Sequence, residues 1–383
     1  KITFVYLLCM ALVAHLGGVL TTLKRFAAPA FSPVLRNIVF LIGLTGFARF
    51  TEAKGELLAW CVAIAGFVQL ALLWWTCLRA RLPVAIQNPV FDSDIKRLFV
   101  LMGPGVLAAG IQQINLLVGG IIASFQQGAI STLYYSDRVY QLPLGMIGIA
   151  FGMVLLPEIT RLLSNGKESE AAGTMRSAIE LAMIITVPAA VAFVAIPQEI
   201  MALLFERGAF TPEDSRRCGQ ALAAFSIGLP AFVLIKVLTP AFFARENTKT
   251  PMIYASISAV INLVLGYALF MTLGFWGLAV ATLIAAWINV GMLLRTLLRS
   301  GDFAPDARLL GRLPRIGLAS GVMAIGVWYM AKQADHMLGD SFVMNYFVLG
   351  LVSFAGLCLY ALAGWAIRAY SPDDIRYALG KQK

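Results

Sequence analysis

The stretch from residue 252 to residue 294, MIYASISAVINLVLGYALFMTLGFWGLAVATLIAAWINVGMLL, decides the fold class of this chain. It contains no Asp, Glu, Lys or Arg. A helix needs about 20 apolar residues to cross the hydrocarbon core of a bilayer. The stretch is therefore long enough for two spanning helices, which we predict over 252–271 and 274–294.

The composition of the whole chain also indicates a membrane environment. Of the 383 residues, 60% are hydrophobic and only 13% are charged, and the mean hydropathy is +0.81. A soluble domain carries about 25% charged residues, so a soluble protein of this composition could not cover its surface. The formal charge of +10 therefore does not indicate nucleic acid, and we expect membrane lipids around the chain.

Further apolar runs of spanning length occur along the chain, and with the two above they make eleven. We predict an all-α, polytopic membrane protein with spans near 2–23, 33–50, 56–78, 98–124, 129–157, 177–197, 218–243, 252–271, 274–294, 313–331 and 342–367. Pro143 and Pro230 fall inside two of these runs. We expect them to break or kink the helices, because proline removes one backbone hydrogen bond.

The charges in the connections indicate the orientation of the chain. When alternate connections are taken as cytoplasmic, most Lys and Arg residues fall on that side, as the positive-inside rule requires. The amino end is then outside and the carboxyl end is cytoplasmic. Residue 1 is Lys and opens directly into an apolar run, so we expect the chain to be a fragment whose first part is missing.

An internal repeat indicates how the spans are grouped. Residues 58–79 align without gaps on residues 278–299, with eight identities, although apolar sequences also match by chance. The repeat predicts two six-helix lobes around a central cavity, a transporter layout. The predicted domains are half of a first lobe at 1–80, a cytoplasmic linker at 81–97, a complete second lobe at 98–299, and two additional helices with a cytoplasmic tail at 300–383.

Arg138 is the most informative polar residue of the predicted spans. It lies roughly 14 Å from the outer end of its run, at 1.5 Å per residue, and an arginine at that depth needs an anionic partner. One alternative is an ion pair with Asp137, although neighbouring helix residues point about 100° apart. The other is an anionic ligand such as a phosphate group. Tyr134, Tyr135 and Gln141 could add hydrogen bonds if they face the cavity.

A second polar cluster, Gln112, Gln113 and Asn115, lies on the preceding span. These side chains either line the same cavity or form hydrogen bonds between helices. The two histidines are far apart, which argues against a His-rich metal site, and no nucleotide-binding or hydrolase motif is present. We therefore expect no enzyme activity and no cofactor.

Three motifs resemble the MurJ (MviN) family of lipid II flippases. They are residues 134–145 with Leu155-Leu156-Pro157, residues 204–211 in an outer connection, and residues 236–251. The resemblance runs over essentially the whole chain. It implies a MATE-like exporter fold of fourteen helices in the inner membrane of a bacterium. It also implies a cargo, the undecaprenyl-pyrophosphate-linked disaccharide-pentapeptide, which moves from the cytoplasmic to the periplasmic leaflet by alternating access.

The resemblance also assigns roles to particular positions. Arg138 matches the essential arginine of the second lobe, and Gln141 stands where the family often has a carboxylate. Asn262 and Thr282 match a sodium site of some relatives, but its acidic position is Gly266 here, so they are weak candidates. The last two spans would form a groove for the lipid tail. Coupling to a monovalent ion or to the membrane potential, and other cell-wall synthesis proteins as partners, are further expectations.

Three other functions are alternatives. A cation-coupled multidrug exporter of the same fold needs a carboxylate in its cavity, and Asp137 is the sole acid in the middle of a predicted span. Another polyprenyl-pyrophosphate glycan flippase would use the same arginine. A membrane glycosyltransferase or phosphatase would show clustered acidic residues or histidines in a large interfacial loop, whereas the predicted loops are short.

Overall fold

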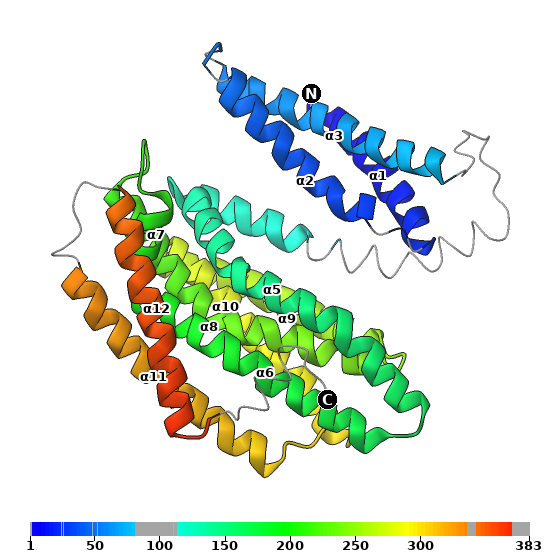
Figure 1. The fold of residues 1–383 in the computed structure, drawn as a ribbon, viewed down its shortest axis with the longest axis vertical. Helices are drawn as coiled ribbons and strands as arrows, with labels where there is room; N and C mark the ends of the chain where they lie inside the picture. The colour runs from blue at the N-terminus through cyan, green and yellow to red at the C-terminus, as the bar shows by residue number, and fades with distance from the viewer. Residues whose placement is uncertain are drawn as a thin grey trace. The chain divides into compact units, whose positions relative to one another are not determined.

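A computed structural model gives the arrangement of the chain (Figure 1). It describes residues 2–80 except 24, 26, 48 and 52, together with residues 110, 113–334 and 342–369. Within these ranges the secondary structure is entirely helical, without strands, which confirms the predicted all-α class. The predicted linker 81–97 and the side chain of Gln112 lie outside the described residues.

The chain divides into two compact units, residues 1–96 and residues 97–383. The first unit contains α1 (Phe4–Thr22), α2 (Ala27–Ile42), which continues as the π-helical turn η1 (Gly43–Phe47), and α3 (Lys54–Arg79). Helix α3 packs against both α1 and α2. Leu20, Leu73 and Cys77 form the buried centre of the α1–α3 contact.

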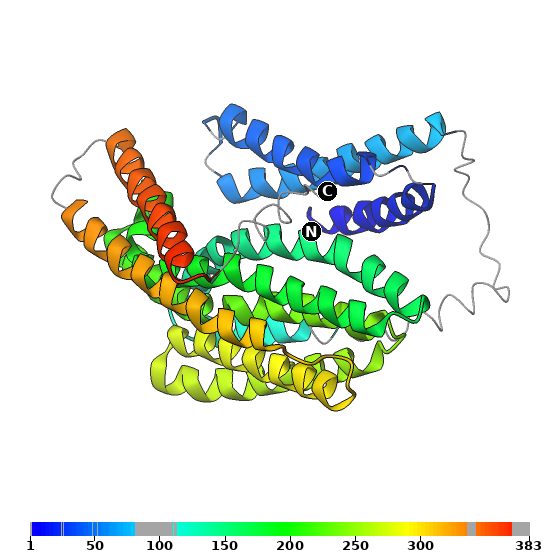
Figure 2. The same ribbon diagram turned by 60° about the horizontal axis from the view of Figure 1, so that its bottom comes forward.

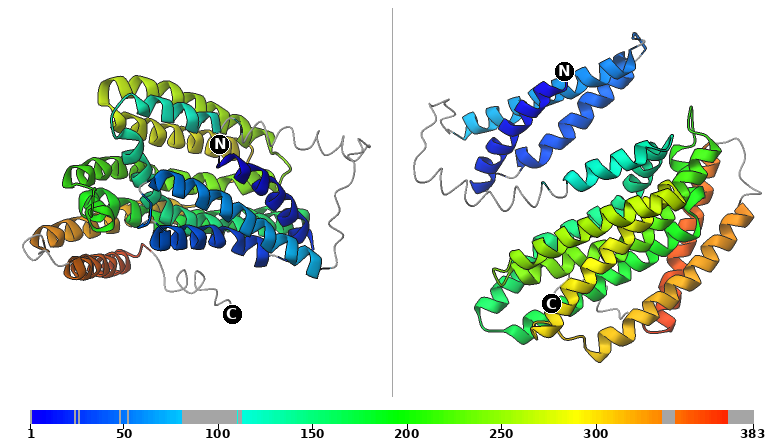
Figure 3. Two further views of the ribbon diagram at one scale, coloured as in Figure 1. Left: turned by 90° about the horizontal axis from the view of Figure 1, so that it is seen from above. Right: turned by 180° about the vertical axis from the view of Figure 1, so that it is seen from behind.

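The second unit is built around α8 (Pro212–Phe243). This helix contacts α5, α6, α7 and α10, and small buried residues such as Ala221 and Ala231 allow the close approach. The surrounding helices are Gln113–Ser124, α5 (Ala129–Ser164), α6 (Glu168–Ala195), the short α7 (Pro197–Phe205), α9 (Lys249–Leu273) and α10 (Phe275–Arg299). Helices α9 and α10 form an antiparallel pair (Figure 3).

Two further helices, α11 (Ala307–Ala334) and α12 (Phe342–Ala366), lie side by side along this bundle (Figure 2). Helix α11 packs on α6, and its first turns are fixed by ion pairs. Both Arg308 and Arg312 pair with the buried carboxylate of Glu180 on α6. Together these contacts attach the α11–α12 pair to the helices around α8.

The described helices match the predicted spans. Nine of them, α1, α2 with η1, α3, α6 and α8 to α12, are long and apolar enough to cross a membrane. Each of the eleven predicted runs overlaps a described helix. For the run 98–124 this helix is Gln113–Ser124, and most of the residues before it lie outside the described ranges. The chain is therefore a multi-pass membrane protein.

The prolines do not break these helices, which corrects one prediction. Pro143 lies inside α5 and Pro230 lies inside α8, and each helix continues through its proline. A membrane helix tolerates proline where neighbouring helices cover the freed backbone group. Pro230 meets this condition, since it is buried within the bundle.

Candidate functional site

Helix α5 positions the predicted site through its contacts with α8. Gly128, with a φ of 77°, forms the turn before α5, in the left-handed region that favours glycine. The buried Ser136 hydroxyl donates to the Cys218 carbonyl oxygen on α8 at 2.7 Å. Four residues later, the Tyr140 ring stacks on Phe225 of α8, with 5.1 Å between the centroids. One side of α5 is thereby fixed against α8.

The opposite side of α5 is exposed within the second unit. Ile130, Tyr134, Arg138 and Leu142 repeat at intervals of four residues and form one exposed stripe. In this stripe the Arg138 guanidinium carbon lies 4.7 Å from the centroid of the Tyr134 ring. Such a cation–π contact contributes about 0.5–1 kcal/mol at an exposed site, so Tyr134 orients the guanidinium without neutralising its charge.

Asp137 has another partner than the adjacent arginine. Its Oδ2 accepts a hydrogen bond from the Gln141 amide nitrogen one turn along the helix. Among the residues that the structure describes, no carboxylate oxygen lies within 4.0 Å of the Arg138 guanidinium. The ion pair between Asp137 and Arg138, weighed from the sequence, does not form in this arrangement.

Tyr135 belongs to a different environment from Tyr134. Its ring lies against Phe205 and Phe210, with centroid distances of 4.9 and 5.3 Å. It is therefore packed against the end of α7 and the loop that follows, and it does not share the exposed stripe with Arg138.

The second predicted cluster joins helices. The Asn262 amide on α9 donates to Asn115 Oδ1 at 3.4 Å, and the Thr282 hydroxyl on α10 donates to Asn262 Oδ1 at 3.3 Å. Of the two environments considered for Asn115, the structure shows the one between helices. No hydrogen bond or ion pair between residues of the described ranges links this group to Arg138.

The candidate sodium ligands Asn262 and Thr282 are thus already hydrogen-bonded to each other. Gly266, at the position of the missing acid, lies 3.3 Å from Leu278 and 3.9 Å from Ala281, measured from where a Cβ would stand. Across the described part of the chain, no three His, Cys, Asp or Glu side chains are grouped so that they could hold a metal ion.

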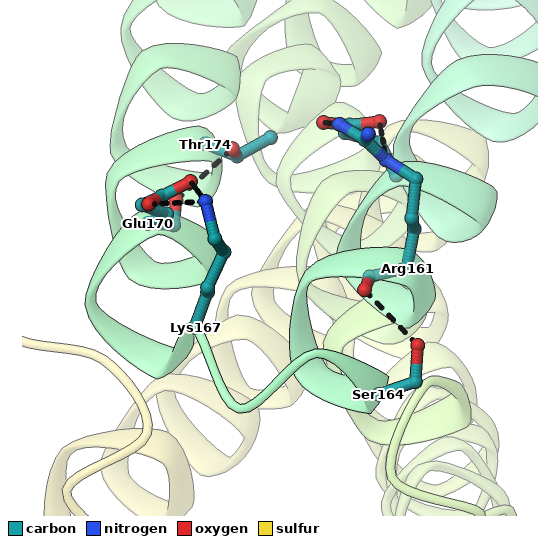
Figure 4. Close-up of polar contacts among 6 residues, drawn as sticks. Arg161, Ser164, Lys167, Glu170 and Thr174 are labelled. Carbon is teal, nitrogen blue, oxygen red and sulfur yellow. Dashed lines mark hydrogen bonds and ion pairs between the residues drawn. The ribbon is translucent and has the colours of Figure 1, made fainter.

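The far end of α5 is polar and carries local ion pairs. Arg161 pairs with Glu158 at 2.7 Å, and Lys167 pairs with Glu170 at 2.9 Å across the turn into α6 (Figure 4). The Glu158–Arg161 pair is local, because its partners are three positions apart along the helix.

Two features of the site were missed from the sequence. Tyr134 contacts the Arg138 guanidinium through its ring face, and the spacing of four residues along the helix was a signal that could have identified this contact. The contact of Tyr135 with Phe205 and Phe210 had no comparable signal, because these residues are 70 or more positions away in the sequence.

Comparison with known proteins assigns the chain to a family. The family model described as lipid II flippase MurJ matches residues 1–352. The chain belongs to the MurJ family. Family membership favours a lipid II flippase over the drug exporter and over the glycosyltransferase or phosphatase considered from the sequence. The family is one of transporters.

Individual relatives agree with this assignment. The chain is similar to a probable lipid II flippase MurJ of Rhizobium meliloti (strain 1021), with 43% identity over 98% of the chain and 71% of the relative. A protein of the same description from Rickettsia prowazekii (strain Madrid E) is 32% identical over 98% of the chain and 74% of the relative. A solved structure of lipid II flippase MurJ in an inward closed conformation has a TM-score of 0.73 and 24% identity, covering 93% of this chain and 70% of that one. This last match supports the fold.

Proposed function

We propose that this chain translocates lipid II, the undecaprenyl-pyrophosphate-linked disaccharide-pentapeptide, from the cytoplasmic to the periplasmic leaflet by alternating access. Membership of the MurJ family supports translocation of lipid II as the transport step. The observation that supports the role of this chain's own residues is the exposed Arg138 guanidinium on a membrane helix, with Tyr134 against it and with Asp137 bonded elsewhere.

Arg138 suits a diphosphate for electrostatic reasons. A charged side chain at membrane depth costs several kcal/mol unless it faces protein or water and meets a counter-charge. The guanidinium stays protonated and offers planar donors that bind two phosphate oxygens at once. In the proposed site Arg138 therefore supplies the counter-charge for the pyrophosphate, which otherwise could not leave water.

The neighbouring residues have supporting roles in this proposal. Tyr134 fixes the guanidinium through its ring face. Gln141 donates a hydrogen bond to the Asp137 carboxylate, which leaves the positive charge of Arg138 for the ligand. Gln141, which stands at a position where the family often carries an acid, acts here as the hydrogen-bond donor.

The energy for export is proposed to come from the membrane potential. One elementary charge crossing the membrane changes its energy by about 2.3 kcal/mol per 100 mV, and the pyrophosphate carries negative charge. Coupling to a monovalent ion is the other proposal. The hydrogen-bonded Asn262 and Thr282 offer neutral oxygen ligands but no carboxylate of their own to such an ion.

The remaining proposals concern the cellular setting. We place the chain in the bacterial inner membrane with a cytoplasmic carboxyl end, because this orientation puts most basic connections on the cytoplasmic side. We further propose that α11 and α12 form the groove for the polyprenyl tail, and that other cell-wall synthesis proteins are partners.

The experiment is complementation in a strain depleted of its own lipid II flippase, combined with a measurement of lipid II reaching the periplasmic leaflet. Arg138→Gln and Arg138→Lys should both abolish translocation in a stably inserted full-length protein, since lysine lacks the planar pair of donors. Arg161→Gln is the matched control, because it removes an arginine of the same helix that is already paired with Glu158. Full complementation by Arg138→Gln would overturn the proposed role.

A further inference from the structure

Helix α12 is attached to the rest of the second unit by two tyrosine hydroxyl groups. The Tyr346 hydroxyl donates to the carbonyl oxygen of Leu203 on α7, and the Tyr360 hydroxyl donates to the carbonyl oxygen of Ile184 on α6, both at 2.8 Å. The two residues are 14 positions apart, or about 21 Å along the helix. They therefore fix α12 at two separate points, and only the Tyr346 bond ends on α7.

The Tyr346 attachment extends into the loop after α7. Arg207 donates one hydrogen bond to the Tyr346 hydroxyl at 3.4 Å and another to the Leu204 carbonyl oxygen at 2.9 Å. The loop is itself fixed to α8, because Glu206 accepts a hydrogen bond from Ser215. A displacement of α12 at this end is therefore passed to the loop.

The same loop meets α5 through three aromatic rings, which we call the ring cluster: Tyr135, Phe205 and Phe210. Their centroids are 4.9 to 5.9 Å apart, within the range of favourable aromatic pairs, each worth about 0.5–1.5 kcal/mol beyond its buried area. The cluster connects the end of α7 and the following loop to α5.

The ring cluster adjoins the proposed pyrophosphate site. The Tyr135 ring meets the Tyr134 ring edge-on at 6.2 Å, and the opposite contact of Tyr134 is the Arg138 guanidinium at 4.7 Å. Arg207 joins the ring cluster through the backbone, since its amide donates to the Phe205 carbonyl oxygen and its carbonyl oxygen accepts from the Phe210 amide. A series of contacts thus runs from Tyr346 on α12 through Arg207, the ring cluster and Tyr134 to Arg138. Chains of packed side chains of this kind carry coupling between sites.

We propose that Tyr346, Arg207 and the ring cluster are positioning residues for Arg138, so that the position of α12 determines how well the guanidinium is placed for its anionic ligand. The proposal rests on the proposed function and extends it to α12. That helix exposes Phe347, Leu351 and Phe354, an apolar surface suited to hydrocarbon chains. A polyprenyl chain lying against α12 would then change the affinity at Arg138 for the headgroup of the same lipid.

The test compares two hydroxyl deletions on one helix in the full-length protein. Tyr346→Phe removes the hydroxyl that ends on α7, and Tyr360→Phe removes the equivalent hydroxyl that ends on α6. Affinity for fluorescently labelled lipid II and thermal stability are measured in detergent for both. Each variant loses a hydrogen bond of 2.8 Å to a backbone carbonyl oxygen, and Tyr346→Phe also loses the longer bond from Arg207, so Tyr346→Phe should lose at least as much stability as Tyr360→Phe. Only Tyr346→Phe should weaken binding, by about three- to tenfold, the size expected for couplings of this kind.

A second variant tests the route of the coupling. Phe210→Leu keeps an apolar side chain but removes one member of the ring cluster, and it should weaken binding in the same way. If both residues act through one series of contacts, the double variant Tyr346→Phe, Phe210→Leu should have the same affinity for lipid II as the single variant that binds it less tightly. Additive losses would overturn the route.

The outcomes separate this inference from the function on which it rests. Equal losses of binding in Tyr346→Phe and Tyr360→Phe, or no loss in either, would overturn the inference while Arg138→Gln still weakens binding. Unchanged binding by Arg138→Gln would instead overturn the proposed role of the guanidinium. A loss in Tyr346→Phe alone, together with a loss in Arg138→Gln, is the result that we expect.

Discussion

Replacement of Glu180 by Gln should destabilise the second unit far more than a single hydrogen bond would. The Glu180 side chain is only 8% exposed, and its carboxylate pairs with Arg312, which is 14% exposed, and with the more exposed Arg308 at 3.5 Å. The substitution keeps the shape of the side chain but removes the negative charge between two cations.

The expected loss follows from the burial of this pair. Breaking a buried ion pair by removing one partner costs about 3–5 kcal/mol, because the other charge remains in a poorly solvated place. We expect the lower end, about 3 kcal/mol, since Arg312 is not completely buried. The affected contact is between α6 and α11, so the first turns of α11 should loosen before the helices around α8 unfold.

The assay is equilibrium unfolding in mild detergent, followed by helix content. Glu158→Gln is the control, because it removes the carboxylate of an ion pair whose side chains are 37% and 66% exposed, and such pairs add little to stability. The reasoning is refuted if Glu180→Gln lowers the free energy of unfolding by less than about 1 kcal/mol, or if both variants behave alike.

Two further substitutions test the packing that holds the site. Gly277→Ala should cost about 2 kcal/mol of stability, typical of overpacking, because a Cβ at this position overlaps the carbonyl group of Leu269 on α9. The control Gly291→Ala, on the same helix, should be tolerated because a Cβ there meets open space. Equal Tm values for the two variants would contradict this prediction. Ser136→Ala should cost about 1 kcal/mol of stability, because it removes the hydrogen bond to Cys218 on α8. The loss should also shift α5, so lipid II binding should weaken together with Tm. Unchanged binding would show that this bond does not position the site.

Much of the fold could be predicted because the bilayer imposes a simple length rule. Apolar runs of about 20 residues located the spans. The ends were less predictable: α5 continues from Ala129 to Ser164 and α6 begins at Glu168, well outside the apolar runs, since polar residues can extend a helix into water. The continuity of α8 through Pro230 depends on neighbouring helices, which the local sequence does not reveal.

The site was predictable in part. The bond between Asp137 and Gln141 follows from their spacing of four residues. The partners of Asn115 were not predictable, because its amide meets Asn262 across 147 positions of sequence. Only the packing of the helices decides such contacts.

The affinity of the full-length protein for lipid II, measured with and without the Arg138 guanidinium, tests the central claim most directly. Hydrogen bonds to charged groups contribute about 1.5–3 kcal/mol, so Arg138→Gln should weaken binding by about 10- to 100-fold at an unchanged Tm. Undecaprenol, which lacks the pyrophosphate, should bind both forms equally, and inorganic pyrophosphate should compete with lipid II only when Arg138 is present. Equal affinity of the two forms for lipid II would contradict the claim that this guanidinium is the counter-charge of the diphosphate.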